Sequence, residues 1–425
     1  MRKLLFPIFA CMALISGCVR KQGEELVVRY AFWGSNKQQE IEQNVVKAFE
    51  TENPGIRIEL VPIGGSRYAE KIQAMMVGQV APDVLMVEMN QYLEWAARGA
   101  LLNVTSDVQA LTEGNPLMPL PAKAFEADGG YFAVPINCSG YAMYLNLDAL
   151  RTGGVSADEL RTWNDLLRLA PRLSRHSKLA RNSGAPTDYA LLMPPPLIVF
   201  WAFGGEMFDD PFRPTRVTVR SSQAGAALGF LRAMYASGYA APPDVSADQG
   251  TYQLFRDGKV AIYFDGRWRT PELDGRTAFR WDVRPMPAGP AGQVTLHGGT
   301  GLAISKTSRQ QEAARKFIRF YASEMGSAIA ASGGRSVPVY RKLAYDESFL
   351  GLHPPDHIRV FSETMEAEAS RLSVYCAGSS QVRDLFGARV EQALVEPERP
   401  LEEILTGLEA DLNRWLERQK KKGLF

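Results

Sequence analysis

The order of strand and helix patterns over residues 26–98 constrains the fold of this chain most strongly. Three short apolar stretches are each followed by a longer stretch with the 3.6-residue period of an amphipathic helix. The predicted strands cover residues 26–32, 56–61 and 84–87, and the predicted helices cover residues 37–52, 68–76 and 91–98. Because a β-α-β-α-β order favours parallel strands joined by right-handed crossovers, we expect an α/β layer architecture.

The remainder of the chain predicts further strands and helices in a less regular order. A helix begins near Thr162, which is a suitable N-cap, and polar residues 174–187 predict a loop. Further strands are expected at residues 131–135, 141–145 and 259–264, with a break at 137–140, and further helices at 310–322 and 380–421. We find no internal repeat and no low-complexity tract.

The length of the chain predicts two lobes. About 400 residues follow the N-terminal segment, whereas single hydrophobic cores stop growing at about 250–300 residues. The 48 basic and 47 acidic residues give a net charge of +1, so nothing in the charge argues for a nucleic-acid partner. Beyond the N-terminal segment, no apolar stretch reaches the ~20 residues of a membrane-spanning helix.

The N-terminal segment predicts export from the cytoplasm. Arg2 and Lys3 precede an apolar run over residues 4–15, which is typical of a signal peptide covering residues 1–17. The Ser-Gly-Cys at residues 16–18 resembles a bacterial lipobox, which implies cleavage before Cys18 and a lipid on its sulfur. Residues 18–25 then form a lipidated tether that anchors an extracytoplasmic protein to the membrane. The alternative is an ordinary signal peptide with an incidental cysteine.

Two cysteines remain in the mature chain once Cys11 leaves with the signal peptide and Cys18 takes the lipid. An even pair in an oxidising compartment is compatible with a disulfide. Cys138 and Cys376 are therefore either bridged or free and buried, and the sequence leaves both possibilities open.

No catalytic or metal-binding pattern stands out. The four histidines lack metal-ligand spacing, and the two that are four residues apart, His353 and His357, flank a Pro-Pro pair that excludes a regular helix. There is no Gly-x-Ser-x-Gly elbow, and acidic pairs of the kind that glycosidases use cannot be identified by counting. We therefore expect neither an enzyme nor a cofactor or metal site.

The ends of the predicted strands supply candidate ligand contacts, because ligands of open parallel sheets lie beyond the carboxyl ends of the strands. Trp33 follows the first strand and offers a flat apolar platform to a ligand, although core packing is the alternative. Glu88 follows the third strand and offers a carboxylate to ligand hydroxyl groups, or it is simply a solvated charge. Asn137 and Ser139 lie in the predicted break.

Aromatic and glycine-rich segments in the second half add further candidates. Trp268 follows a strand that ends at an Asp-Gly pair, so a cleft position is favoured. Asp265 and Arg267 flank this turn and either bind hydroxyls or pair with each other. Trp201 lies in an apolar run that suits a core or a cleft. The Gly-Gly-Thr-Gly at 298–301 lacks the Lys-Ser/Thr ending of a P-loop, so Gly299 and Thr300 are expected in a bare stretch of backbone lining the cleft.

Taken in order along the chain, several short motifs resemble family 1 extracellular solute-binding proteins, which include maltose-type and glycerol-phosphate-type receptors. The resemblance covers nearly the whole mature chain, and no single motif carries it alone. The motifs are Trp33, Pro-Asp-Val at 82–84, Asp-Gly-Gly-Tyr-Phe-Ala-Val-Pro at 128–135, Tyr-Leu-Asn-Leu-Asp at 144–148, Thr-Trp-Asn-Asp-Leu at 162–166, Phe-Arg-Asp-Gly-Lys-Val-Ala-Ile at 255–262, Asp-Gly-Arg-Trp at 265–268 and Gly-Gly-Thr-Gly-Leu-Ala-Ile-Ser at 298–305.

The resemblance implies a two-lobed periplasmic-binding-protein fold of type II. Each lobe is expected to hold a mixed sheet flanked by helices, with crossover hinge strands between the lobes and the ligand in the cleft. One lobe would comprise residues 26–136 and 297–345, and the other residues 137–296 and 346–425. Closure of the lobes around the ligand is the expected motion.

The resemblance also implies a function and further contacts. The protein would act as a monomer that binds a mono- or oligosaccharide and delivers it to the permease subunits of an ABC importer. The alternatives are a ligand-presenting partner of a membrane sensor and a receptor for glycerol phosphate or an acidic sugar. Residues that match or lie near family contact segments are Tyr68, Ser139, Arg335 and Tyr375.

Overall fold

The computed structural model describes residues 25–34, 36–175, 186–245, 250–334, 336–352, 354–366, 370–371 and 378–422. The predictions for the signal peptide, for Cys18 and for most of the tether fall outside these ranges. Those for Arg335, Tyr375 and Cys376 also lie outside the described residues.

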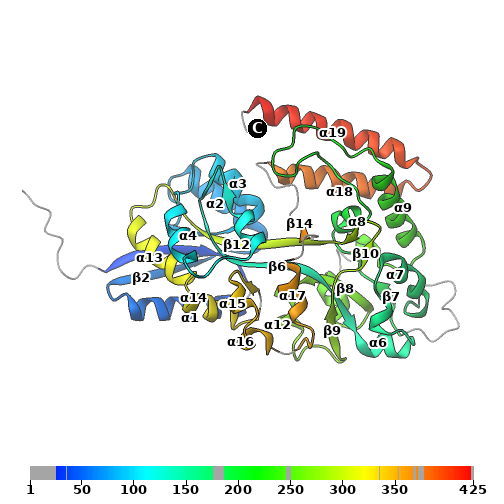
Figure 1. The fold of residues 1–425 in the computed structure, drawn as a ribbon, viewed down its shortest axis with the longest axis horizontal. Helices are drawn as coiled ribbons and strands as arrows, with labels where there is room; N and C mark the ends of the chain where they lie inside the picture. Colours follow the sequence, from blue (N-terminus) through cyan, green and yellow to red (C-terminus); the bar gives the residue numbers. More distant parts are fainter. Residues whose placement is uncertain are drawn as a thin grey trace, which may run out of the picture.

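One ten-stranded sheet runs through both halves of the molecule, with the main order β2-β1-β3-β12-β6-β8-β7. Its two longest strands, β6 (Val134–Asn146) and β12 (Thr295–Ile304), pair antiparallel at the centre and cross from one lobe to the other (Figure 1). We therefore call them the crossing strands. The short strands β13 (Val337–Pro338), β14 (Ser370–Arg371) and β9 (Trp281–Arg284) pair with them at the side.

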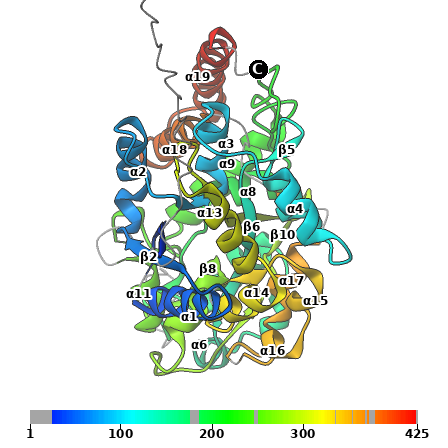
Figure 2. The same cartoon turned by 90° about the vertical axis from the view of Figure 1, so that its left-hand side faces the viewer.

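The N-terminal lobe contains the three parallel strands that the sequence predicted. Its strands are β1 (Leu26–Phe32), β2 (Ile56–Pro62) and β3 (Val84–Glu88). Helices cover both faces of this sheet, and Figure 2 shows α13 and α14 beside α1. These helices are α1 (Asn36–Glu52), α2 (Tyr68–Val77), α3 (Met89–Ala97), α4 (Thr105–Thr112), α5 (Pro119–Ala124), α13 (Gln311–Tyr321) and α14 (Glu324–Ala331), with the short hairpin of β4 (Glu126–Ala127) and β5 (Gly130–Tyr131).

The C-terminal lobe is built around β7 (Tyr189–Leu191), β8 (Val260–Gly266) and β9. Its largest core lies between this sheet and a layer of helices that includes the two terminal helices, which are orange and red in Figure 1. The helices are α6 (Leu147–Thr152), α7 (Trp163–Leu169), α8 (Pro196–Ala202), α9 (Ser222–Ala236), α11 (Thr251–Arg256), α12 (Thr270–Leu273), α18 (Ser379–Val395) and α19 (Leu401–Lys421), and the small hairpin is β10 (Ala288–Gly289) with β11 (Gly292–Gln293).

A further apolar cluster lies beside the crossing strands and joins the two lobes. It includes Cys138 and Tyr144 of β6, and Phe361 packs on the Tyr144 ring with centroids 6.1 Å apart. The helices that contribute to this cluster are α15 (Arg341–Ala344), α16 (Glu347–Leu350) and α17 (Arg359–Thr364). The lobe boundaries proposed from the sequence run through this region and stay a prediction.

The two-lobed α/β fold class is confirmed, and so are most of the predicted elements. Thr162 caps α7 as expected: its hydroxyl accepts a bond from the Asp165 amide at 3.1 Å, and the Asp165 carboxylate accepts one from the Thr162 amide at 3.0 Å. Among the described residues, no helix combines the length and the apolar character needed to cross a membrane.

The predicted break at residues 137–140 is wrong, because β6 continues through it without interruption. Polar residues and a glycine suggested a loop there. However, Asn137, Ser139 and Gly140 all pair with residues of β12, and the backbone hydrogen bonds of that ladder override weak local strand propensity. The Gly-rich segment at 298–301 likewise belongs to a strand and not to a loop.

Candidate ligand-binding site

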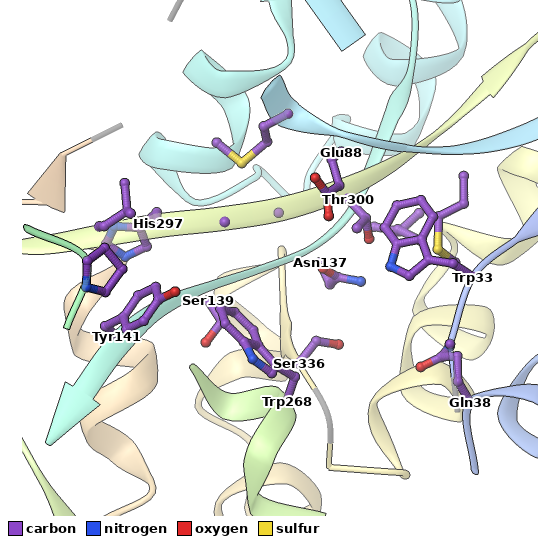
Figure 3. A pocket seen from close by; sticks show the side chains of 18 of the residues that line it. Trp33, Gln38, Glu88, Asn137, Ser139, Tyr141, Trp268, His297, Thr300 and Ser336 are labelled. Carbon is purple, nitrogen blue, oxygen red and sulfur yellow. The ribbon is translucent and has the colours of Figure 1, made fainter. Parts of the chain in front are cut away.

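A cavity of about 650 Å³ lies where the crossing strands pass between the lobes. Both lobes and both crossing strands supply side chains to its wall (Figure 3). The lining includes Trp33, Gln38, Met86, Glu88 and Met89, then Asn137, Ser139 and Tyr141 of β6, His297 to Thr300 of β12, Pro195 to Leu197, Trp268, Tyr321, Ser327, Ser336, and Arg383 with Phe386 on α18.

Strand register places three predicted contact residues side by side. Glu88 of β3 pairs with Thr300 of β12, and Thr300 pairs with Asn137 of β6. A carboxylate, a hydroxyl and an amide therefore form a row across three adjacent strands (Figure 3). The Thr300 hydroxyl is buried and has no hydrogen-bond partner among the described residues, so it is available to a ligand.

The alternation of β6 extends this polar row. Because successive side chains point to opposite faces of a strand, Asn137, Ser139 and Tyr141 share the cavity face, while Cys138 points to the apolar cluster on the other side. Gly299 of β12 stands opposite Cys138. A Cβ atom at Gly299 would lie 2.8 Å from the Asn137 carbonyl oxygen, so only glycine permits this close approach of the strands.

Trp33 lines the cavity from the N-terminal lobe, and Tyr68 supports it from behind. The Tyr68 ring packs edge-on against the indole with centroids 4.8 Å apart, and its hydroxyl donates to the Ala31 carbonyl at 3.1 Å. Tyr68 is only 2% exposed and is not part of the cavity wall. The structure thus gives Tyr68 a supporting position and does not bring it to the cavity as a direct contact.

Trp268 lines the cavity from the C-terminal lobe. It lies in the short helix η5 (Arg267–Arg269) directly after β8, and its ring meets the Tyr141 ring at 87° with centroids 5.7 Å apart. The indole folds back over Gly266, where a Cβ atom would lie 2.2 Å from the ring. A larger residue at Gly266 would therefore push the indole out of this position.

Two residues of opposite charge line the cavity, Glu88 of β3 and Arg383 of α18. Burial in the cleft raises the pKa of Glu88, and the attraction of Arg383 on α18 partly offsets this rise. The Glu88 side chain is still reached by solvent, so it combines access with partial desolvation. A carboxylate in this position attracts hydrogen-bond donors strongly.

His297 adds a neutral group to the wall near Tyr141 (Figure 3). The side chain is 5% exposed, and burial lowers its pKa to about 3, so the imidazole is uncharged at neutral pH. A backbone hydrogen bond with Arg371 also acts on the ring, so His297 contributes a neutral and mostly enclosed group to the wall.

The structure does not bring Trp201, Asp265 or Arg267 to the cavity. Trp201 lies on α8 within the core of the C-terminal lobe, because every residue of that helix is apolar and buried or nearly so. The Asp265 carboxylate is occupied by Arg269 at 2.9 Å and by the Tyr263 hydroxyl. The expected pairing of Asp265 with Arg267 is therefore absent between these described residues.

Arg267 is buried behind the cavity wall and is 1% exposed. Its backbone amide donates to the Ser139 hydroxyl at 3.0 Å, and its guanidinium lies 5.7 Å and 5.9 Å from the ring centroids of Phe349 and Phe361. Nε and Nη1 have no hydrogen-bond partner among the described residues, and burial lowers the pKa of this guanidinium to about 10.

Several lining residues were missed from the sequence. Tyr141 was assigned to a strand, but its cavity-facing position was hidden by the supposed break before it. Gln38 follows Trp33 closely, and its position in the first turn of α1 was a usable signal. Arg383 and His297 carried no local signal, because the fold brings them to the cavity from distant parts of the chain.

Cys138 is a free, buried thiol, and burial raises its pKa to about 12. Within the described ranges, no group of three or more His, Cys, Asp or Glu side chains is arranged to hold a metal ion. The site thus offers aromatic faces and hydrogen-bonding groups to a ligand.

Residues 34–328 match the family described as bacterial extracellular solute-binding protein, which is more than half of the chain. The chain belongs to this family. Its place of action is therefore outside the cytoplasm, and its role is the binding of a solute. The cavity at the crossing strands is the site that the geometry offers for that solute.

Two curated relatives show how far this solute-binding protein has diverged. It is 21% identical over 345 residues to the arabinooligosaccharide-binding protein of Bacillus subtilis (strain 168), covering 75% of this chain and 76% of the relative. It is also 21% identical over 340 residues to the galactooligosaccharide-binding protein of the same organism, covering 77% and 76%.

A solved structure supports the fold. The ABC substrate-binding protein Lmo0181 from Listeria monocytogenes, in complex with cycloalternan, superposes with a TM-score of 0.81 at 22% identity. The match covers 92% of this chain and 99% of that protein. The two-lobed architecture is thus shared over nearly the full length.

Proposed function

We propose that this solute-binding protein takes a mono- or oligosaccharide into the cavity between its lobes and delivers it to the permease subunits of an ABC importer. The observation that carries the proposal is the combination of Trp33 and Trp268, from opposite lobes, with a row of carboxylate, hydroxyl and amide groups on neighbouring strands. The relatives named above, which are named for or bound to oligosaccharides, support the same class of ligand.

The chemistry of the wall suits a carbohydrate. Indole faces cover the apolar C–H side of a sugar ring, and burial of such area contributes about 25 cal/mol per Å². Glu88 and Asn137 meet the ring edge, where hydroxyl groups both donate and accept hydrogen bonds. Because Trp33 and Trp268 come from different lobes, a ring held between them stabilises the closed arrangement of the lobes.

The N-terminal sequence supports attachment to the membrane through a lipid on Cys18. Two signals are generally needed for a stable lipid anchor, and a diacylglycerol supplies two acyl chains at one residue. The polar residues after Cys18 then act as a tether that holds the two lobes near the permease, with the protein working as a monomer.

A receptor for glycerol phosphate or an acidic sugar is the second candidate, and Arg383 is the observation in its favour. Its guanidinium lines the cavity and would pair with an anion. Glu88 opposes this assignment, because its carboxylate lies in the same cavity and repels an anionic ligand. We therefore favour a neutral carbohydrate.

The test begins with a thermal-shift screen of mono- and oligosaccharides, with glycerol phosphate included. Calorimetry then compares the wild type with Trp268→Ala, for which we expect affinity to fall about 10- to 100-fold, equivalent to the ~1.5–3 kcal/mol of a buried aromatic contact, without loss of folding. Trp268→Phe keeps an aromatic face and should lose much less. Equal affinity of Trp268→Ala and wild type would remove this residue from the site, and binding of glycerol phosphate alone would favour the second candidate.

A further inference from the structure

A buried carboxyl group lies one hydrogen bond behind the cavity wall. Glu42 on α1 is fully buried, and it touches two residues that do line the cavity. Gln38 Nε2 donates to Glu42 Oε1 at 2.6 Å, and the Tyr321 hydroxyl donates to the same oxygen at 3.0 Å. The second oxygen, Oε2, has no hydrogen-bond partner among the described residues.

The local backbone holds Gln38 in this arrangement. Gly34 has a φ of +153°, and a Cβ atom there would lie 2.4 Å from both Cβ and Cγ of Gln38. The Gln38 side chain is therefore pressed against the turn that follows Trp33. Gln38 and Glu42 are also four residues apart on one helix, which places them on the same face.

The charge state of Glu42 determines which groups the wall presents. An ionised carboxylate only accepts hydrogen bonds, so it takes the Gln38 amide hydrogen and the Tyr321 hydroxyl hydrogen. The Gln38 carbonyl oxygen and the Tyr321 oxygen lone pairs are then left for the cavity. A protonated carboxyl carries its hydrogen on Oε2, the oxygen beside the Tyr30 hydroxyl, and its Oε1 is then a weaker acceptor that holds the Gln38 amide and the Tyr321 hydroxyl less firmly.

We propose that Glu42 is a positioning residue for Gln38 and Tyr321, the two cavity-lining residues that it holds. Its ionisation sets whether they present hydrogen-bond acceptors or donors to the cavity, and it thereby couples ligand affinity to pH. This inference rests on the proposed function only in assuming a ligand rich in hydroxyl groups. With Glu42 ionised, the wall joins Glu88 in presenting acceptors to such a ligand. With Glu42 protonated, the weaker acceptor no longer fixes the Gln38 amide, so its NH2 group can turn toward the cavity, and the match is poorer.

The surroundings of Glu42 bring the pKa of its carboxyl group close to neutral pH. Burial raises its pKa from 4.5 to about 7, although the hydrogen bonds from Gln38 and Tyr321 favour the ionised form. The hydroxyl of Tyr30 on β1 lies close to this carboxyl and also lowers its pKa. In the described part of the chain, no cation forms an ion pair with Glu42.

Charged side chains on the elements packed around α1 are engaged elsewhere. Glu324 of α14 pairs with Lys342, Arg319 of α13 pairs with Asp107 at 2.5 Å, and Arg57 of β2 pairs with Glu25 at 3.2 Å. Glu42 thus titrates against neutral neighbours, and desolvation dominates its behaviour.

The first experiment needs no ligand. Protein labelled with ¹⁵N in its glutamine side chains is titrated from pH 5 to 9, and the Gln38 amide signals are assigned from their loss in Gln38→Met. We expect these signals to shift with a midpoint near neutral pH in wild type and to stay constant in Glu42→Gln. Glu40→Gln is the matched control, because Glu40 lies on the same helix but is exposed and pairs with Lys37 at 3.2 Å. A Gln38 signal that does not titrate overturns the proposal.

The second experiment measures affinity for maltotriose and for any other oligosaccharide that shifts the melting temperature. If only the ionised form binds well, the apparent dissociation constant rises about tenfold from pH 8 to pH 6, because the competent fraction falls by that factor for a pKa near 7. Glu42→Gln should bind more weakly and without this pH dependence, and Glu42→Asp should restore part of it.

The two proposals fail in different ways. Binding of an oligosaccharide with equal pH dependence in wild type and Glu42→Gln overturns the coupling while leaving the carbohydrate assignment intact. If no saccharide binds, the proposed function fails, and the Gln38 titration alone decides whether Glu42 controls the wall.

Discussion

Glu42 should also make the ligand-free protein less stable as the pH rises. The perturbation is a change from pH 5 to pH 8, compared between wild type and Glu42→Gln. Burial raises the pKa of this carboxyl from 4.5 to about 7. Between these two values the folded protein keeps a proton that the unfolded chain releases, so the free energy of unfolding falls as the pH rises through this window.

The magnitude follows from that rise. One pKa unit corresponds to 1.36 kcal/mol, so a rise from 4.5 to about 7 amounts to about 3 kcal/mol in full, of which about 2.5 kcal/mol develops between pH 5 and pH 8. For a folded chain of about 400 residues, this corresponds to a change of about 3 °C in melting temperature. Glu42→Gln carries no titrating group at this position and lacks this contribution.

The assay is thermal and urea unfolding of wild type, Glu42→Gln and the exposed control Glu40→Gln at pH 5, 6, 7 and 8. Subtracting the variant from the wild type cancels the other titrating groups. We expect the difference between wild type and Glu42→Gln to change by about 2.5 kcal/mol toward lower wild-type stability at pH 8. A difference that stays constant across this range would refute the account of a desolvated carboxyl at this position.

Two further substitutions test the packing around the crossing strands. Gly299→Val places a side chain 2.8 Å from the Asn137 carbonyl oxygen. We therefore expect the free energy of unfolding to fall by about 1–3 kcal/mol in thermal unfolding, and ligand binding to weaken in calorimetry. An unchanged melting temperature would show that the two strands can separate freely. Arg267→Met removes a buried guanidinium whose Nε and Nη1 have no hydrogen-bond partner among the described residues, so we expect the protein to become more stable by about 1 kcal/mol. Lower stability of this variant would mean that the cation–π contacts outweigh the cost of desolvation.

The sequence was sufficient for the fold because its local patterns agree with the tertiary structure. The three N-terminal strands and their helices were predicted to within a few residues, since the apolar periodicity that defines them acts locally. The candidate site was predicted in part. Trp33, Glu88 and Trp268 each lie at the end of a strand or within two residues of it, and their cavity positions are a consequence of where the strands end.

The rest of the site depends on pairing that no local pattern reveals. The segment from Asn137 to Gly140 looked like a loop, yet β12 supplies the hydrogen bonds that keep it extended, and this continuity brings Tyr141 to the cavity. Arg383 reaches the same cavity from α18, more than two hundred residues later. Trp201 and Arg267 were expected at the ligand because aromatic and charged groups near glycines suit a cleft, whereas packing places both behind the wall.

The unbroken ladder between β6 and β12 has a mechanical consequence. Since both lobes belong to one hydrogen-bonded sheet, any change in their mutual angle must be absorbed as bending and twisting of these two strands. The pairing of the strands is irregular between Thr300 and Gly301, which is the natural place for such deformation. Thr300 also lines the cavity. A ligand that contacts Thr300 therefore acts directly on the segment whose curvature sets the angle between the two lobes.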